Sequence, residues 1–178
     1  IMGGTQSIVN NAQLIKKVYF PREIIPLSIV LSSFVNYLIT LIILFIGIFI
    51  AKIPIGIPLI AFPVVLFLFL IFTIGLTLIL SSLNVIYRDV SHFVEVAFMA
   101  WIYLTPVIYQ MDLIPAKIRP LMYLNPMTLV LNSIRACLYE NNFPSVKVVL
   151  ALSVVAFVFL WIGFKVFNKL QRRFAEEI

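Results

Sequence analysis

The chain alternates between long apolar runs and short polar connections. A helix needs roughly 20 apolar residues to cross a bilayer. Four runs reach that length, and the third only just does so: residues 27–51, 57–83, 91–110 and 145–167. The pattern predicts an all-α integral membrane protein, a single helical bundle over residues 1–178 in which four transmembrane helices are visible.

One segment fits neither a span nor an ordinary loop. Residues 111–140 are too polar and broken to cross a bilayer, yet they are unusually apolar for a connection. Pro115 suits the first turn of a short helix, and "NPMT" predicts a second helix with Asn125 as its N-cap and Pro126 as its first residue. Two arrangements remain open. The two helices dip into the outer leaflet as a re-entrant pair, or they lie on the outer surface as an amphipathic pair.

Composition also indicates a membrane environment. Only 11% of the residues are charged and the mean hydropathy is +1.14, whereas soluble domains carry about a quarter charged residues. The net charge of +6 is scattered between the apolar runs, as basic residues flanking spans are, so no nucleic-acid partner is expected. The chain begins with Ile1 and its first 26 residues are no signal peptide, so an N-terminally incomplete chain is expected.

The sequence carries no catalytic constellation. The single cysteine, Cys137, allows no internal disulfide and no multi-cysteine metal site. The single histidine, His92, lies far from it in sequence, and no GxxxxGK[ST] phosphate loop is present. We therefore expect no catalytic residue and no metal site, and any ATP hydrolysis would belong to another chain.

Basic residues predict the orientation. Four spans put both ends on one side of the membrane. Eight of the 13 lysines and arginines fall on that side and five on the other, and an excess of basic residues marks the cytoplasm. The segment before the first span and the tail, residues 168–178, are therefore predicted to be cytoplasmic. An apolar face of the last turns is predicted to anchor the tail or to dock a partner, and it comprises Phe167, Leu170, Phe174 and Ile178.

Small polar residues recur at intervals of four in the first two spans, so each span carries a polar stripe along one helical face. Close helix packing with interhelical hydrogen bonds is favoured over the lining of a pathway. The stripes are Ser28, Ser32, Asn36 and Thr40 in the first span, and Thr73, Thr77 and Ser81 in the second.

Aromatic residues gather on the third span. Flat aromatic side chains suit the apolar C–H faces of sugar rings, so this set is a candidate translocation pathway. The alternative is core packing for Phe98 and Trp101 and an interfacial aromatic belt for Tyr109. The candidate pathway residues are Phe98, Trp101, Tyr103, Thr105 and Tyr109.

A cluster of charged residues surrounds the start of the third span. Asp89 is predicted to cap the helix, and Arg88 to meet headgroups or a partner. His92 lies three residues before Glu95 and on the same face, so the two could pair. Glu95 lies one turn inside the span, where snorkelling competes with a functional role. We group these four residues as a candidate cytoplasmic-loop contact.

Three stretches, in this order, resemble the membrane permeases of type-2 ABC exporters that move polysaccharides, O-antigen or teichoic acids. They are "LIKKVYFPREIIPLS", "NVIYRDVSHFVEVAFMAWIYLTPVIY" and "IPAKIRPLMYLNPMTLVLNSIRACLYE". The resemblance implies a six-span subunit, two of whose spans would precede Ile1. It implies a homodimer with two copies of an ATP-binding cassette subunit, which would bind ATP and Mg, so no cofactor is expected in this chain.

The resemblance also implies roles for particular segments. Residues 11–25 would form a cytoplasmic coupling helix, residues 111–140 re-entrant gate helices, and the third visible span would line the channel. The residues implied in ATPase coupling are Lys16, Lys17, Tyr19, Phe20, Pro21, Arg22 and Glu23. Those implied in the outer gate are Pro106, Pro115, Asn125 and Pro126.

The function implied is export of a lipid-linked polysaccharide across the cytoplasmic (inner) membrane of a bacterium or archaeon. An ABC exporter of drugs or lipids would share the architecture. A membrane-embedded enzyme acting on polyprenyl-linked sugars would need convergent acids or histidines, and only His92 and Glu95 are available. A passive assembly subunit is the remaining alternative.

Overall fold

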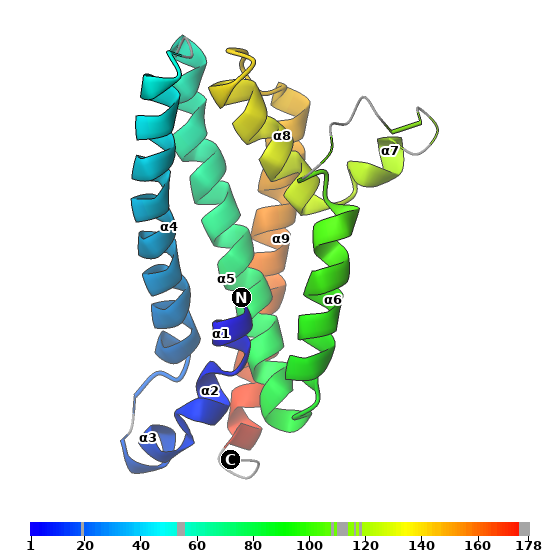
Figure 1. Cartoon of the computed structure of the whole chain (residues 1–178). Coiled ribbons are helices and arrows are strands. Elements are labelled where there is room, and N and C mark those ends of the chain that lie inside the picture. The colour runs from blue at the N-terminus through cyan, green and yellow to red at the C-terminus, as the bar shows by residue number, and fades with distance from the viewer. Residues whose placement is uncertain are drawn as a thin grey trace.

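The protein is an all-helical bundle with the elongated form of an integral membrane protein (Figure 1). The computed structural model describes residues 1–18, 20–52, 56–107, 109, 114–115, 117 and 119–174. Within those residues every regular element is a helix. The predicted fold class is confirmed.

Nine α-helices and two short 3-10 helices, η1 and η3, make up the described part of the chain. In order they are α1 Met2–Thr5, α2 Ser7–Asn10, α3 Ala12–Lys17, α4 Ile24–Ile50, η1 Ile57–Ala61, α5 Phe62–Ile86, α6 Val90–Leu104, α7 Arg119–Met122, α8 Pro126–Leu138, α9 Val146–Leu170 and η3 Gln171–Arg173. Three stretches are long and apolar enough to cross a membrane: Ile24–Ile50, Ile57–Ile86 and Val146–Arg173.

The third predicted span is shorter than the sequence pattern suggests. α6 ends at Leu104, and Thr105 is extended with φ −103° and ψ 134°. Pro106 follows, and the residue before a proline is sterically disfavoured in the α conformation. Fifteen residues span about 22 Å as a helix, against roughly 30 Å for the hydrocarbon core. The aromatic residues of α6 therefore lie on a helix that stops short of the end of the bundle at which α5 begins (Figure 1).

α5 and α9 form the centre of the bundle and cross at two glycines. A Cβ on Gly75 would lie 2.4 Å from the carbonyl carbon of Phe159, and one on Gly163 would lie 2.5 Å from the carbonyl oxygen of Gly75. Only residues without a side chain allow backbones to approach so closely, which is a common basis of helix association in membranes.

The two polar stripes have different surroundings. On α5, Thr77 and Ser81 are buried, and Thr77 packs against Gly4 of α1. The packing prediction is therefore confirmed there, but the predicted interhelical hydrogen bonds are wrong. The hydroxyls of Thr73 and Ser81 donate instead to carbonyls of their own helix, Phe69 and Leu78.

On α4 the stripe lies on an exposed face. The side chains of Ser28, Ser32, Asn36 and Thr40 are all exposed in this chain. The hydroxyl of Thr40 donates to the carbonyl of Asn36 at 3.0 Å, within the same helix. Within the described residues, helix packing therefore does not explain this stripe.

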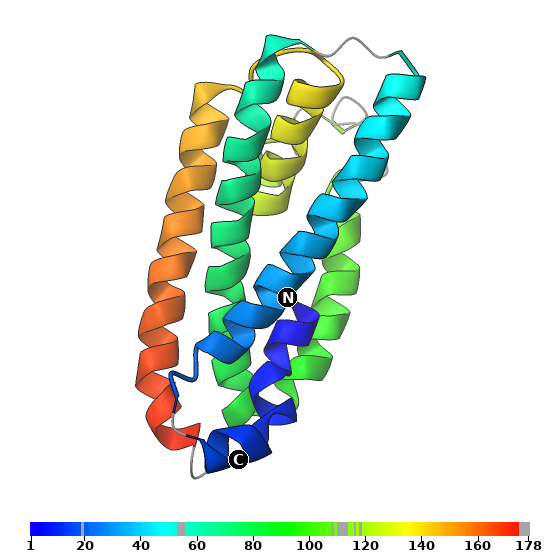
Figure 2. The same cartoon turned by 90° about the vertical axis from the view of Figure 1, so that its left-hand side faces the viewer.

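The bundle has two distinct ends. One holds α3, the turn between α5 and α6, and the C-terminal turn; we call it the elbow end, after the elbow, residues 20–23, that joins α3 to α4 (Figures 1 and 2). The opposite end holds α7 and the connection between α4 and α5. Ile1 lies near mid-height of the bundle, and α1 and α2 run from there toward the elbow end (Figure 2).

Candidate functional site

At the elbow end, α3 presents a mixed apolar and basic surface. Leu14 is 48% exposed and Val18 is 52% exposed. The side chains of Lys16 and Lys17 are exposed on the same short helix, while Ile15 is buried beneath them. Exposed aliphatic side chains beside lysines are suited to contact another protein. Sequence reasoning selected the lysines and missed Leu14 and Val18, because exposure on so short a helix is decided by tertiary packing.

The elbow residues turn partly inward. Phe20, predicted as an anchor for the ATPase, packs partly buried against the core of this chain. The Arg22 guanidinium donates from Nη1 to the backbone carbonyl of Gln171. Pro21 is exposed, and Glu23 precedes α4 without a capping hydrogen bond from its side chain. Tyr19 lies outside the described residues.

The C-terminal turn belongs to the protein core. The predicted anchoring face is occupied within the chain, because Phe167 and Phe174 are fully buried and pack edge to face with centroids 5.5 Å apart. Leu170 is partly buried against the same cluster. The prediction that these three side chains meet the membrane or a partner is therefore wrong. Ile178 lies outside the described residues.

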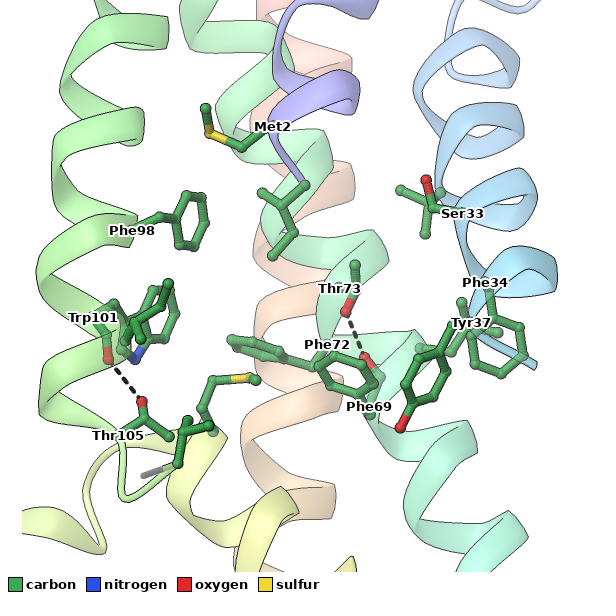
Figure 3. A pocket seen from close by; sticks show the side chains of 16 residues that line it. Met2, Ser33, Phe34, Tyr37, Phe69, Phe72, Thr73, Phe98, Trp101 and Thr105 are labelled. Atoms are coloured by element: carbon green, nitrogen blue, oxygen red, sulfur yellow. Dashed lines mark hydrogen bonds between the residues drawn. The ribbon is translucent and has the colours of Figure 1, made fainter. Parts of the chain in front are cut away.

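A groove of about 430 Å³ runs between α4 and α6, with α5 as its floor (Figure 3). Among the predicted pathway residues, Phe98, Trp101 and Thr105 line it. The rings of Phe98 and Trp101 are stacked, with centroids 5.3 Å apart and planes 3° apart. Met2, labelled in Figure 3, and Met127 also line the groove.

The other two pathway candidates do not line this groove. Tyr103 is 75% exposed on α6. The hydroxyl of Tyr109 donates to the backbone carbonyl of Tyr103 at 3.0 Å. Tyr109, which follows α6, is thereby held to the end of that helix, and neither tyrosine lines the groove with Trp101.

Four further aromatic residues line the groove and were not predicted: Phe34, Tyr37, Phe69 and Phe72. Tyr37 and Phe69 meet edge to face across α4 and α5, with centroids 6.3 Å apart. Each lies in a long apolar run whose facing surface cannot be read from periodicity, since apolar residues cover the whole circumference.

The side chain of Asn125 joins α6 to α8. Its Oδ1 accepts from Trp101 Nε1 at 2.8 Å and from the Met127 backbone N–H at 3.0 Å, the predicted N-cap bond. Its Nδ2 donates to Thr105 Oγ1 at 2.9 Å and to the Leu104 carbonyl at 3.4 Å. An amide side chain offers two acceptor sites and two donors, so Asn125 uses all four. Trp101, a sequence-based candidate for either sugar stacking or core packing, is thereby fixed to the start of α8.

α8 packs into the bundle rather than lying across its end. Val65, Leu68, Leu129, Val130 and Leu152 form one buried cluster from α5, α8 and α9. This arrangement favours the re-entrant alternative over the surface-lying one. Pro126 is the first residue of α8, as predicted.

The prolines before α8 mark the irregular part of the outer segment. Pro106 is buried directly after α6, and Arg135 of α8 donates to the Val107 carbonyl beside it at 2.9 Å. Pro115 lies before α7, which begins at Arg119. The Arg119 backbone N–H donates to the Pro115 carbonyl at 3.3 Å. Ala116, Ile118 and most of the other residues of 108–118 lie outside the described residues, so the prediction that Pro115 occupies the first turn of a helix stays a prediction.

At the turn between α5 and α6, the side chain that caps the start of α6 is not the predicted one. Asp89 is the N-cap residue of α6 by position, but its side chain makes no capping hydrogen bond. Asn84 of α5 instead accepts from the Ser91 backbone N–H at 2.9 Å. The side chains of Arg88, His92 and Glu95 are exposed, so this turn offers charge at the elbow end, and the predicted pairing of His92 with Glu95 stays a prediction.

Comparison with known proteins matches residues 5–139 to the family described as ABC-2 type transporter. An O-antigen export system permease protein RfbA of Myxococcus xanthus is 35% identical over 99% of this chain and 68% of its own length. One of Klebsiella pneumoniae is 36% identical over 96% of this chain and 66% of its own. A probable multidrug ABC transporter permease YbhS of Escherichia coli is 27% identical over 79% of this chain and 38% of its own. The chain spans about two thirds of the length of the O-antigen permeases it matches.

Proposed function

We propose, from the premise that this chain belongs to the ABC-2 type transporter family, that it is the membrane-spanning permease of an ATP-driven polysaccharide exporter. The observation that carries this proposal is the 35% identity to an O-antigen export permease along 99% of the chain. Three helices long and apolar enough to span, and the shorter α6, suit a multi-pass membrane protein. The cargo would be a lipid-linked glycan of the O-antigen or teichoic acid type.

In this proposal the elbow end receives the work of ATP hydrolysis. The exposed face of α3, with Leu14, Lys17 and Val18, offers an apolar and basic surface to an ATP-binding cassette subunit. Burial of aliphatic side chains in an interface favours association through the hydrophobic effect, and the charges around them contribute to orientation and association rate. ATP and Mg would be bound by that partner, so the permease alone would not be an enzyme.

At the outer end, α6 and α8 would move as one unit. Asn125 holds Trp101 and Thr105 of the α6 end against the first turn of α8. A displacement of α6 would therefore carry the re-entrant segment with it. The aromatic residues of the groove, together with exposed Tyr103 and half-buried Tyr109, are the surfaces on which we place the glycan.

The assembly would be a homodimer with two ATP-binding subunits in the inner membrane of a bacterium or archaeon. Two further spans would precede Ile1, as the family resemblance implies. A membrane-embedded enzyme is less well supported, because His92 and Glu95 are both exposed. In the described part of the chain, no three histidine, cysteine or acidic side chains gather as a metal site.

Co-purification with the ATP-binding subunit tests the proposal, using the full-length protein that carries this chain. Leu14→Glu places a charge on the exposed face of α3 and should weaken the complex roughly tenfold or more, the equivalent of about 1.4 kcal/mol. Leu124→Glu makes the same change at an exposed position outside α3 and should leave the complex intact. If both variants bound the ATP-binding subunit equally well, the conclusion would be that α3 is not part of the interface.

A second candidate function is export of drugs or lipids, favoured by the similarity to the Escherichia coli permease. ATP hydrolysis by the complex in liposomes separates the two candidates. Stimulation by a lipid-linked glycan, and not by the lipid carrier alone or by amphipathic drugs, supports polysaccharide export. Stimulation by drugs or lipid alone supports the second candidate.

A further inference from the structure

We propose that the C-terminal turn holds the elbow to α9, so that a displacement of the elbow moves α9 together with α4. We call this connection the C-terminal clasp; it consists of Arg22, Gln171 and Phe174. The inference rests on the proposed function in one respect, that a partner acts on the elbow end. It makes Phe174 a positioning residue for force transmission, a role that neither composition nor motif assigns to it.

The first contact of the clasp is the hydrogen bond from Arg22 to the carbonyl of Gln171, residues 149 positions apart in sequence. Gln171 is the C-cap residue of α9. The Gln171 carbonyl also accepts from the Phe174 backbone N–H at the end of η3, so Arg22 is its second donor. A cation at a helix C-terminus also interacts favourably with the helix dipole, which adds to the attraction between Arg22 and the end of α9.

The second contact is the burial of Phe174. Its side chain is fully buried in a cluster with residues of α2, α3, α4, α5 and α9. The cluster comprises Ile8, Ile15, Ile25, Leu78, Val85, Phe167 and Phe174, with Phe20 of the elbow packed against it. The cluster that buries Phe174 thus includes side chains from the elements on both sides of the elbow, Ile15 of α3 and Ile25 of α4.

The arrangement of the long helices gives the clasp its mechanical significance. The elbow continues directly into α4, most of whose side chains are exposed. Leu41 and Ile48 of α4 meet α5 in a core cluster, so the clasp is a second connection from the elbow to the bundle core. α9 is packed closely on α5 through Gly75 and Gly163. Through the clasp, a push on the elbow reaches α9 and, by that crossing, α5.

A distance measurement tests the clasp directly. Spin labels are placed at Ile24→Cys and Lys169→Cys, both exposed, in a Cys137→Ser background, and the distance distribution is recorded in lipid. Phe174→Ala should broaden that distribution, and Arg22→Gln should broaden it less. The matched controls are Phe164→Ala, a more exposed phenylalanine of α9, and Arg173→Gln, an exposed neighbour. Both controls should leave the distribution unchanged.

The complex with the ATP-binding subunit supplies the second readout. Phe174→Ala should retain ATP hydrolysis while transport per ATP falls at least about fivefold, the lower limit of ordinary coupling; Phe164→Ala should lose neither. If Phe174→Ala does not fold, the spin-label distance distribution of Arg22→Gln alone tests the clasp. Distributions and transport ratios equal to those of the controls would overturn the clasp. If the unsubstituted permease formed no complex with an ATP-binding subunit, the proposed function would be contradicted. The spin-label distances, measured in the permease alone, would still test the clasp.

Discussion

α4 and α5 are alike in sequence and unlike in their surroundings. Their most apolar windows have mean hydropathies of 2.5 and 2.8, yet 11% of the first is buried in the chain against 39% of the second. Both carry small polar residues at intervals of four. Hydropathy therefore identifies a helix that tolerates lipid, but it does not say whether another helix covers it.

The difference comes from small residues that allow close approach. α5 has Gly75 opposite Gly163 of α9, and Thr77 opposite Gly4 of α1. On α4, a Cβ added to Gly47 would meet no neighbouring atom within 4 Å. In lipid, where apolar surface alone does not drive helices together, such close packing decides association. α5 is therefore the structural centre, whereas α4 meets the rest of the chain through fewer buried side chains.

Replacing the glycines of the crossing should have the largest effect. Gly75→Ala forces a methyl group into the backbone of α9, and overpacking of this kind costs typically about 1–3 kcal/mol, occasionally more. Because the contact is with backbone rather than a flexible side chain, we expect the upper part of that range. The measurement is the free energy of unfolding in mixed micelles.

The matched control is Gly47→Ala on α4. Alanine is favoured over glycine in a helix by about 1 kcal/mol and meets no neighbour there, so stability should be unchanged or slightly higher. If the two alanine variants were equally stable, the contrast between α5 and α4 would be lost.

Asn125→Ala should rank second. It removes the N-cap of α8, worth about 1 kcal/mol, and the hydrogen bonds to Trp101 and Thr105, each worth about 1 kcal/mol net. We expect a loss of about 2–3 kcal/mol in unfolding free energy and a shift in Trp101 fluorescence in a Trp161→Phe background. Asn132→Ala on the same helix takes part in none of these bonds and should change neither. If the fluorescence spectrum of Trp101 did not change in Asn125→Ala, the connection of α6 to α8 through Asn125 would be refuted.

The cap of α6 should give a smaller effect. Asn84→Ala removes the acceptor for the Ser91 N–H and should cost about 1 kcal/mol. Asp89→Ala, at the position favoured by the sequence, should cost less because its side chain caps nothing. Thermal unfolding of the two variants, measured side by side, shows which loses more stability. A larger loss for Asp89→Ala would support Asp89 as the cap of α6, as the sequence predicts.

The smallest expected change is Thr77→Val. Thr77 Oγ1 is buried and has no hydrogen-bond partner within the described residues. Valine keeps the shape against Gly4 and removes an unsatisfied hydroxyl, so stability should stay within about 0.5 kcal/mol or rise. A loss above about 1 kcal/mol, measured in the same micelles, would mean that this hydroxyl is bonded.

Sequence reasoning recovered the elements better than their contacts. The long helices, the Asn125 cap and the start of α8 at Pro126 follow from local rules. α6 was predicted too long because the apolar run continues past Thr105, where Pro106 ends the helix.

The inward role of Phe174 and the groove aromatics depend on which face of an all-apolar helix meets its neighbour. Periodicity carries no such information when every face is apolar. The glycines at the α5–α9 crossing were the available signal, since a glycine within a helix suggests close packing.

The most direct test is movement of a lipid-linked glycan across liposomes that contain the full-length permease and its ATP-binding partner. The account predicts transport only when partner and ATP are both present, and a lower rate with Leu14→Glu because its complex with the partner is weaker. Transport by the permease alone, without nucleotide and at the same rate, would contradict it.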